Sequence, residues 1–301
     1  MDILFAKSTD LGQTFSDPIM VSELWQRDWG IGSSPALAVD GNQVYIGWMG
    51  GTPNLLLWDI YFALSRDAGK TFSPSVRLSK RTREGEFAAG PQLLAGNNGH
   101  VYVGWMQVLG GPPPSPRDMY FVRSTDGGHT FDKTLNLSNN PQAHNLGPVM
   151  AVADDNIYVA WMSARGGNKI LFSRSTDAGE TFSTPRDIAR DPSGTASSPR
   201  IAVIEKGTLP DPCNTEDIVY LAWHDSRTGP SEIFFSVSLD SGVTFSEPQN
   251  VSNTFSLTSG LRLVVAGNNV YLTWMVNRAR NWDVFFVRGQ LDLDDKLPLT
   301  Q

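Results

Sequence analysis

The sequence predicts an all-β fold, a β-propeller made of four-stranded antiparallel blades. Three observations support this prediction: an octapeptide that occurs five times, strand patterns that end in tryptophan between its copies, and turn-forming residues along the whole chain. The 301 residues include 28 glycines and 19 prolines, which are spread out and not gathered in one linker. Many short strands joined by turns are the expected result.

The octapeptide has the pattern Ser-x-Asp-x-Gly-x-Thr-Phe and occupies residues 8–15, 65–72, 124–131, 175–182 and 238–245. Its copies are 51 to 63 residues apart, a spacing that suits one four-stranded blade. A short Asp or Ser side chain accepts hydrogen bonds from backbone N–H groups that follow it, and glycine readily takes a positive φ. We therefore interpret the octapeptide as a hairpin fastener with five structural aspartates, Asp10, Asp67, Asp126, Asp177 and Asp240. The phenylalanine that closes each copy is expected to pack between sheets.

Strand patterns A, B and C precede the octapeptide, and a strand D follows it. Strand A is predicted at 35–39, 91–95, 148–152, 199–203 and 261–265. Strand B is predicted at 44–48, 101–105, 157–161, 219–223 and 270–274, where Tyr and Trp alternate on one face and tryptophan comes last. Strand C is predicted at 60–64, 119–122, 170–172, 233–235 and 284–286.

Five A–B hairpins predict five blades, or six if the chain is a fragment. Residues 2–8 also match strand C, so the chain begins in the middle of a blade. We expect residues 3–22 to complete the blade begun at 261–288, because joining the termini removes exposed sheet edges. One domain then covers residues 1–301, and the strand at 284–286 is surplus.

The octapeptide resembles the Asp-box, or BNR repeat, of sialidases and many other propellers, and with its flanking strands the resemblance covers nearly the whole chain. The resemblance implies a sialidase-like propeller, a triad of arginines that binds the sialic acid carboxylate, and a tyrosine nucleophile. Just after the start of strand A the chain has Ala36, Gln92, Val149, Arg200 and Arg262. Arg200 and Arg262 thus match two of the three arginines. Either they bind a carboxylate or each pairs with a loop acid such as Asp225 or Asp191.

Every tyrosine already belongs to strand B or strand C, so none is left as a nucleophile. The Arg-Ile-Pro motif found near the start of sialidases is also missing. The resemblance therefore favours a non-sialidase member, a propeller that binds a glycan or a protein without catalysis. The alternative is a glycoside hydrolase, either an exo-α-sialidase or a carboxylate-based enzyme that uses acids among Asp28, Glu84, Glu86, Asp191 and Asp225.

The B–C and D–A connections are predicted to be long and varied, and together they form the binding face. Besides Arg200 and Arg262, the ligand-binding candidates there are Trp25, Arg27, Asp28, Trp29, Trp58, Asp225, Arg278 and Trp282. Exposed aromatic rings suit sugars or the side chains of a partner, or they simply cap the blades. Asp225 lies in a Trp-x-Asp-x-Arg pattern that is expected to order its loop.

The composition narrows the range of possible partners and cofactors. A net charge of −7 with no basic stripe argues against nucleic acid, and no apolar run is long enough to span a membrane. Cys213 is the only cysteine, and the four histidines are scattered, so we predict no disulfide, no metal site and no cofactor. Because similar chains are commonly exported, we expect an extracellular or cell-surface protein whose upstream segment has been removed. A larger surface assembly and a cytoplasmic location stay open.

Overall fold

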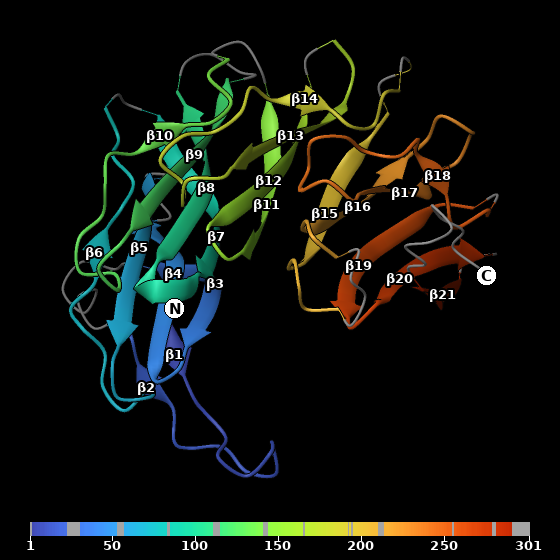
Figure 1. Cartoon of the computed structure of the whole chain (residues 1–301). Coiled ribbons are helices and arrows are strands. Elements are labelled where there is room, and N and C mark those ends of the chain that lie inside the picture. Colours follow the sequence, from blue (N-terminus) through green and yellow to red (C-terminus); the bar gives the residue numbers. More distant parts are fainter. Residues whose placement is uncertain are drawn as a thin grey trace. The chain divides into compact units, whose positions relative to one another are not determined.

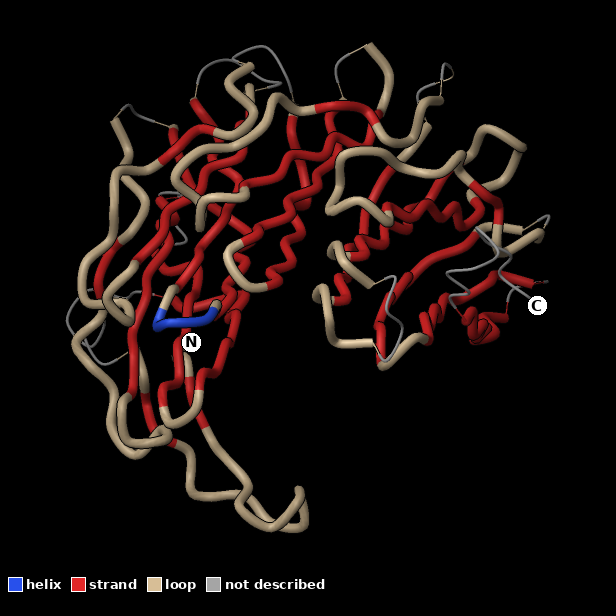
Figure 2. The backbone as a smooth tube through the Cα atoms, viewed as in Figure 1, coloured by secondary structure: helices blue, strands red, loops and turns tan. Residues whose placement is uncertain are grey.

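A computed structural model describes residues 2–22, 31–52, 57–82, 85–110, 115–140, 144–164, 166–191, 193, 195–209, 214–254, 256–278 and 281–290. These residues form strands and connecting loops, with one short 3-10 turn at Asn97–Gly99 (Figure 2). The chain divides into two compact units, Met1–Pro148 and Val149–Gln301, and each is described by itself.

The first unit contains one two-stranded and two four-stranded antiparallel sheets (Figure 1). The two-stranded sheet pairs β1 (Leu4–Phe5) with β2 (Ile19–Met20). The next sheet has β3 (Ile31–Asp40), β4 (Gln43–Thr52), β5 (Leu57–Ser65) and β6 (Val76–Arg77) in that order. The third has β7 (Glu86–Ala95), β8 (Val101–Leu109), β9 (Arg117–Ser124) and β10 (Leu135–Asn136).

The second unit contains two four-stranded sheets and one three-stranded sheet (Figure 1). The first joins β11 (Asn145–Ala153), which begins just before the unit boundary, to β12 (Asn156–Ser163), β13 (Lys169–Ser175) and β14 (Arg186–Asp187). The second has β15 (Ser197–Ile204), β16 (Ile218–Asp225), β17 (Glu232–Ser238) and β18 (Gln249–Asn250). The third has β19 (Thr258–Ala266), β20 (Asn269–Arg278) and β21 (Asn281–Gln290).

The predicted A, B and C strands are all confirmed, and each four-stranded sheet places A, B, C and D side by side. The surplus strand at 284–286 is part of β21, which pairs along the whole of β20. Strands β1 and β2 pair with each other. That residues 3–22 complete the blade of 261–288 stays a prediction.

Cross-strand aromatic pairs form the core of these sheets. Trp48, Trp105 and Trp223 of strand B are almost completely buried. Each stacks on the residue paired with it in strand C, with ring centroids 6.0 to 6.4 Å apart. The expectation that Tyr and Trp share one face of strand B is wrong, because Tyr45 and Trp48 are three positions apart and so point to opposite faces, where both are buried. Strand B is therefore covered on both faces, and the stacked pairs hold neighbouring strands in register.

The octapeptides form the expected hairpins. In the copy at 124–131, the Ser124 hydroxyl donates to Asp126 Oδ1 at 2.7 Å, and the Thr130 amide donates to the same oxygen at 2.9 Å. The Thr130 hydroxyl donates to Asp126 Oδ2 at 2.6 Å. In the first copy, hydrogen bonds from the Thr14 and Ser8 hydroxyls help to lower the pKa of Asp10 to about 2. The carboxylate thus accepts its hydrogen bonds from within its own hairpin.

The expectation that every closing phenylalanine is packed is wrong for Phe15, which is 68% exposed. The corresponding Phe245 is only 6% exposed and packs edge-on against Phe172 of the preceding sheet at 5.0 Å. Among the described residues of the first unit, no sheet precedes β1 and β2, so Phe15 lacks an equivalent neighbour in its own unit.

Candidate functional site

A β-bulge near the start of strand A sets the direction of the candidate arginines. The register of β15 with β16 shifts between Ser197 and Arg200, and that of β19 with β20 shifts between Ser259 and Arg262. Within these bulges Ser198 has φ 51° and Gly260 has φ 66°. Because a bulge bends its strand and redirects the next side chain, both arginines leave their strands at equivalent points.

The two guanidinium groups converge on one backbone oxygen. Arg200 Nε and Arg262 Nη1 each donate to the carbonyl oxygen of Leu261 at 3.0 Å. Arg200 Nη1 also donates to the carbonyl oxygen of Pro199 at 2.7 Å. Burial, and then the charge of Arg262, lowers the pKa of Arg200. Among the described residues, no carboxylate lies within ion-pair distance of either arginine.

The expectation that these arginines pair with loop acids is therefore wrong for both named acids. Asp225 is completely buried and accepts hydrogen bonds from the Trp223 indole, the Thr195 hydroxyl and the backbone and side chain of Arg227. Asp191 accepts from Ser193 and Thr195. Asp225 orders its loop, as the Trp-x-Asp-x-Arg pattern predicts, and its saturated carboxylate leaves it outside the candidate site.

A polar cavity of about 250 Å³ lies beside Arg200. His224 and the hydroxyl residues Ser197, Ser198, Ser231, Thr258 and Ser259 line it. It is below the usual size range of pockets that enclose a drug-sized ligand, so it suits a small polar ligand or one unit of a larger one. Arginine and hydroxyl groups supply the donors that a carboxylate needs.

His224 is uncharged in this site. Its side chain is 8% exposed, and burial, followed by the charge of Arg200, lowers its pKa to about 4. The Thr258 hydroxyl donates to the Ser231 carbonyl oxygen at 2.8 Å, so Thr258 Oγ1 accepts from His224 Nδ1 at 3.0 Å. This assignment leaves Nε2 of the neutral ring as a hydrogen-bond acceptor.

His224, Thr258 and Ser231 were not predicted as site residues. A signal for His224 exists in the repeat, because the residue after the strand-B tryptophan is methionine in the other four copies, Met49, Met106, Met162 and Met275. His224 is the exception, and it lies on β16, the strand that pairs with the bulged β15. Nothing in the local pattern identifies Ser231 or Thr258, which lie in a connection and at the start of β19.

Several other sequence candidates lie outside the described residues: Trp25, Arg27, Asp28, Trp29 and Glu84. Trp58 is half-buried at the start of β5, in the first unit. Trp282 is 51% exposed on β21, and the guanidinium carbon of exposed Arg278 lies 4.7 Å from the centroid of the Phe285 ring. The prediction of long B–C connections is wrong here, because β20 and β21 pair up to Arg278 and Asn281, with only two residues of sequence between them.

The tyrosines do not approach the cavity. Tyr45, Tyr102, Tyr158 and Tyr220 of strand B are at most 1% exposed. Burial, together with the hydrogen bond that the Tyr158 hydroxyl donates to Asp217 at 2.6 Å, raises the pKa of Tyr158 well above its usual value. Burial likewise raises the pKa of Tyr220, so neither phenol is prepared to act as a nucleophile.

Among the described residues, no group of three or more His, Cys, Asp or Glu side chains could hold a metal ion. In the same part of the chain, no helix has the length and apolar character needed to cross a membrane.

No protein-family model matches the chain, and no curated protein is significantly similar to it in sequence. Solved structures do match. A protein of unknown function from Dyadobacter fermentans is 15% identical, with a TM-score of 0.54 over 94% of this chain and 82% of that one. A Trypanosoma rangeli sialidase is 13% identical, with a TM-score of 0.55 over 95% of this chain and 50% of that one, so this chain spans half its length.

The intramolecular trans-sialidase from Ruminococcus gnavus is 10% identical, with a TM-score of 0.52 over 87% of this chain and 85% of that one. Identities this low establish the fold alone. The chain therefore has an all-β fold of the sialidase-like β-propeller class, built from four-stranded antiparallel blades.

Proposed function

We propose that this chain is a binding propeller without catalytic activity, and that Arg200 and Arg262 hold the carboxylate of an acidic glycan. The observation that carries the proposal is the convergence of both guanidinium groups on the Leu261 carbonyl oxygen, with no acidic partner among the described residues. Two neighbouring cations, one half-buried, are destabilising unless an anion joins them. A carboxylate from a ligand would supply that anion.

The surroundings suit the hydroxyl groups of a sugar. The cavity offers hydroxyl side chains that donate or accept, and His224 adds an acceptor at Nε2. The Trypanosoma rangeli sialidase has been solved in complex with sialic acid, and its likeness to this chain supports an acidic sugar as the ligand class. Such a ligand fits an extracellular or cell-surface location, which we include in the proposal.

The absence of catalysis is proposed from the tyrosines. A sialidase needs a tyrosine nucleophile, whereas no tyrosine lines the cavity among the described residues. The alternative, a glycoside hydrolase, is favoured by the neighbouring structures at the level of the fold alone. Of its five candidate acids, Asp191 and Asp225 are engaged by local donors, and Glu86 is buried and accepts from Thr82. That alternative would therefore rest on Asp28 or Glu84, outside the described residues.

The test measures binding of N-acetylneuraminic acid and of its methyl ester by calorimetry or by NMR. The acid should bind more tightly than the ester, and Arg262→Ala should weaken its binding by about tenfold or more, because a charge-assisted hydrogen-bonded pair is lost. Arg288→Ala is the matched control, since it removes an exposed arginine from β21 of the same sheet. Equal binding of acid and ester would overturn the carboxylate role.

Catalysis is tested separately with a fluorogenic sialoside. We expect no turnover above background hydrolysis. Turnover that disappears in both Arg200→Ala and Arg262→Ala would contradict the non-catalytic proposal and restore the glycoside hydrolase alternative.

A further inference from the structure

A recurring contact joins three of the octapeptide hairpins to the sheet before them. Within single units it is made by the ring pairs Phe5–Phe72, Phe62–Phe131 and Phe172–Phe245, which meet edge-on with centroids 5.0 to 5.2 Å apart. A Cβ added to Gly128 or to Gly242 would lie 2.8 Å from the ring of Phe62 or Phe172. The hairpin backbone thus rests directly on the ring. We call the space beside each ring pair a hairpin groove.

In the groove beside Phe172, two arginines bind the hairpin carbonyl groups. Arg174 donates to the carbonyl oxygen of Ser241, and Arg186 donates to those of Gly242 and Val243. The guanidinium carbon of Arg186 also lies 5.6 Å from the centroid of Phe172 and 5.5 Å from that of Phe245. Charge-assisted hydrogen bonds and the two ring faces therefore hold one guanidinium group.

In the groove beside Phe5, a lysine takes the position that corresponds to Arg174. Lys7 Nζ donates to the carbonyl oxygen of Ala68 at 2.5 Å. Ala68 occupies the place in its octapeptide that Ser241 occupies in the last copy. A basic side chain from the preceding sheet therefore meets the same backbone oxygen in both units.

The groove beside Phe62 has the same construction, but neither of the two corresponding strand positions carries a cation. Strand register places Val76 opposite Phe62, as Arg186 is placed opposite Phe172. It likewise places Leu64 where Arg174 stands, each opposite the strand-B tyrosine. The carbonyl groups of Gly127, Gly128 and His129 accept no hydrogen bond from the described residues.

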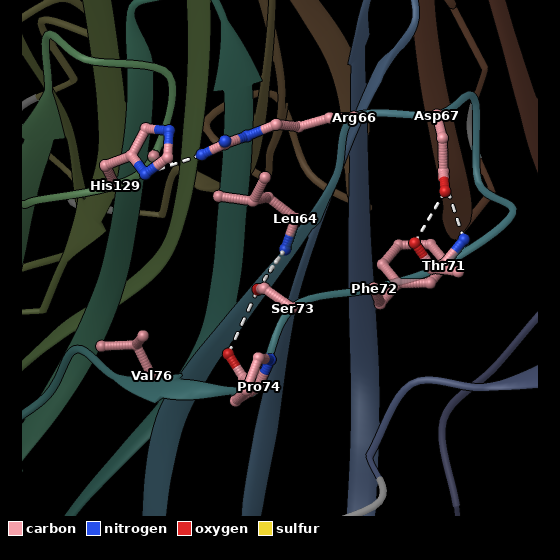
Figure 3. A pocket seen from close by; sticks show the side chains of 10 residues that line it. Leu64, Arg66, Asp67, Thr71, Phe72, Ser73, Pro74, Val76 and His129 are labelled. Atoms are coloured by element: carbon pink, nitrogen blue, oxygen red, sulfur yellow. Dashed lines mark hydrogen bonds between the residues drawn. The ribbon is translucent and has the colours of Figure 1, made fainter.

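An open cavity of about 470 Å³ lies at this position, lined by Leu64, Val76, Gly128 and His129 among others (Figure 3). Arg66 reaches across it, but its Nη2 contacts His129 Nδ1 at 2.7 Å and not the hairpin carbonyl groups (Figure 3). Nearby positive charge does not exclude a further cation, because Arg186 occupies its groove beside Arg174 and Arg190, with Asp240 as the neighbouring negative charge. Asp126 holds the equivalent place in the octapeptide at 124–131.

From this correspondence we propose that the hairpin groove at Val76 binds a guanidinium group, supplied by an arginine side chain of a partner protein. The guanidinium takes the place that Arg186 takes in the second unit, donating to the carbonyl oxygens of Gly128 and His129 beside the Phe62 and Phe131 rings. Arginine is preferred to lysine, because a planar guanidinium can donate to two oxygens while it lies over a ring. This site is separate from the proposed glycan site and does not depend on it.

The probe is N-acetyl-L-arginine methylamide, titrated at constant ionic strength while the backbone amide signals of Gly128 and His129 are followed by NMR. We expect saturable shifts of these signals in the wild-type protein and several-fold weaker binding of N-acetyl-L-lysine methylamide. Val76→Arg should place an internal guanidinium in the groove, abolish the shifts and raise Tm. Val76→Leu is the matched control and should keep the binding.

A reciprocal variant tests the equivalence of the two grooves. Arg186→Val should open the groove beside Phe172, so that the probe then also shifts the amide signals of Gly242 and Val243. The absence of saturable shifts at Gly128 and His129 in the wild-type protein would overturn the proposal, as would unchanged binding by Val76→Arg. Because Val76 is about half exposed, Val76→Arg is expected to fold. The result with Val76→Arg therefore tests the proposal even if Arg186→Val does not fold.

Discussion

At the position just after the bulge of strand A, the first unit carries Ala36 and Gln92, whereas two strands of the second unit carry Arg200 and Arg262. The backbone is equivalent, since each of these residues follows a register shift and pairs with the fourth residue of the strand-B pattern. The repeat therefore fixes where a side chain leaves the sheet, and substitution at a few such points decides its chemistry. The hairpin grooves differ in the same way. The groove beside Phe62 has Leu64 and Val76 at the positions where the groove beside Phe172 has Arg174 and Arg186.

The largest expected effect tests whether the two units share one scaffold. Trp105→Ala and Trp223→Ala each remove a fully buried ring that stacks on strand C. Each should lower the free energy of unfolding by about 3 to 5 kcal/mol, the usual result of truncating a buried aromatic side chain. Denaturant titration followed by circular dichroism measures both.

Trp282→Ala is the control for these variants, because its side chain is half-exposed. It should change stability by no more than about 0.5 kcal/mol. A large effect at Trp223 with a negligible one at Trp105 would show that the two units do not depend on the same packing.

The next effect concerns His224, where the other four strands carry methionine. The folded state holds the pKa of His224 at about 4, below the ordinary value of 6.5, so the unfolded chain binds a proton that the folded chain rejects. Stability is therefore lost as pH falls from 6.5 towards 4, by up to about 3 kcal/mol. His224→Met should remove this slope while keeping the fold, since methionine occupies the equivalent site on the other strands. Thermal or chemical unfolding at several pH values measures it.

The aspartates provide an internal reference for that measurement. The pKa of Asp10 falls from 3.8 to about 2 on folding, so its contribution is lost only as pH falls through that lower range. If the His224→Met protein loses as much stability as the wild type between pH 6.5 and 4, the pH dependence does not arise from His224.

The sequence predicts most of the fold because its information is local and repeated. Short runs of apolar and aromatic residues mark each strand, and Ser, Asp, Gly and Thr define each hairpin within eight positions. The candidate site is only partly predictable: the arginines follow from their place in strand A, but their convergence depends on two bulges and on the Leu261 carbonyl group. Thr258 and Ser231 approach His224 through tertiary packing, for which no sequence spacing gives a signal.

The exposure of Phe15 and the short connection between β20 and β21 were missed for related reasons. A strand pattern indicates which face a residue occupies, but it does not indicate which neighbour covers that face, so Phe15 resembles Phe245 in sequence and differs in burial. The length between two strand patterns likewise overestimates a connection when both strands continue beyond their patterns, as β20 and β21 do.

The smallest effect tests whether the hairpin fastener works equally in both units. Asp126→Ala and Asp240→Ala each remove a carboxylate that accepts hydrogen bonds from the amide and hydroxyl of the threonine four residues on. Each should cost about 1 to 2 kcal/mol of stability, because the hairpin loses its internal acceptor. Asp→Asn at the same positions is the matched control and should cost less, since the amide oxygen still accepts.

Neither alanine variant should alter binding of N-acetylneuraminic acid, because the carboxylates bond within their own hairpins. A binding defect at unchanged stability in either variant would mean that the octapeptide contributes directly to ligand recognition, which contradicts its interpretation as a fastener.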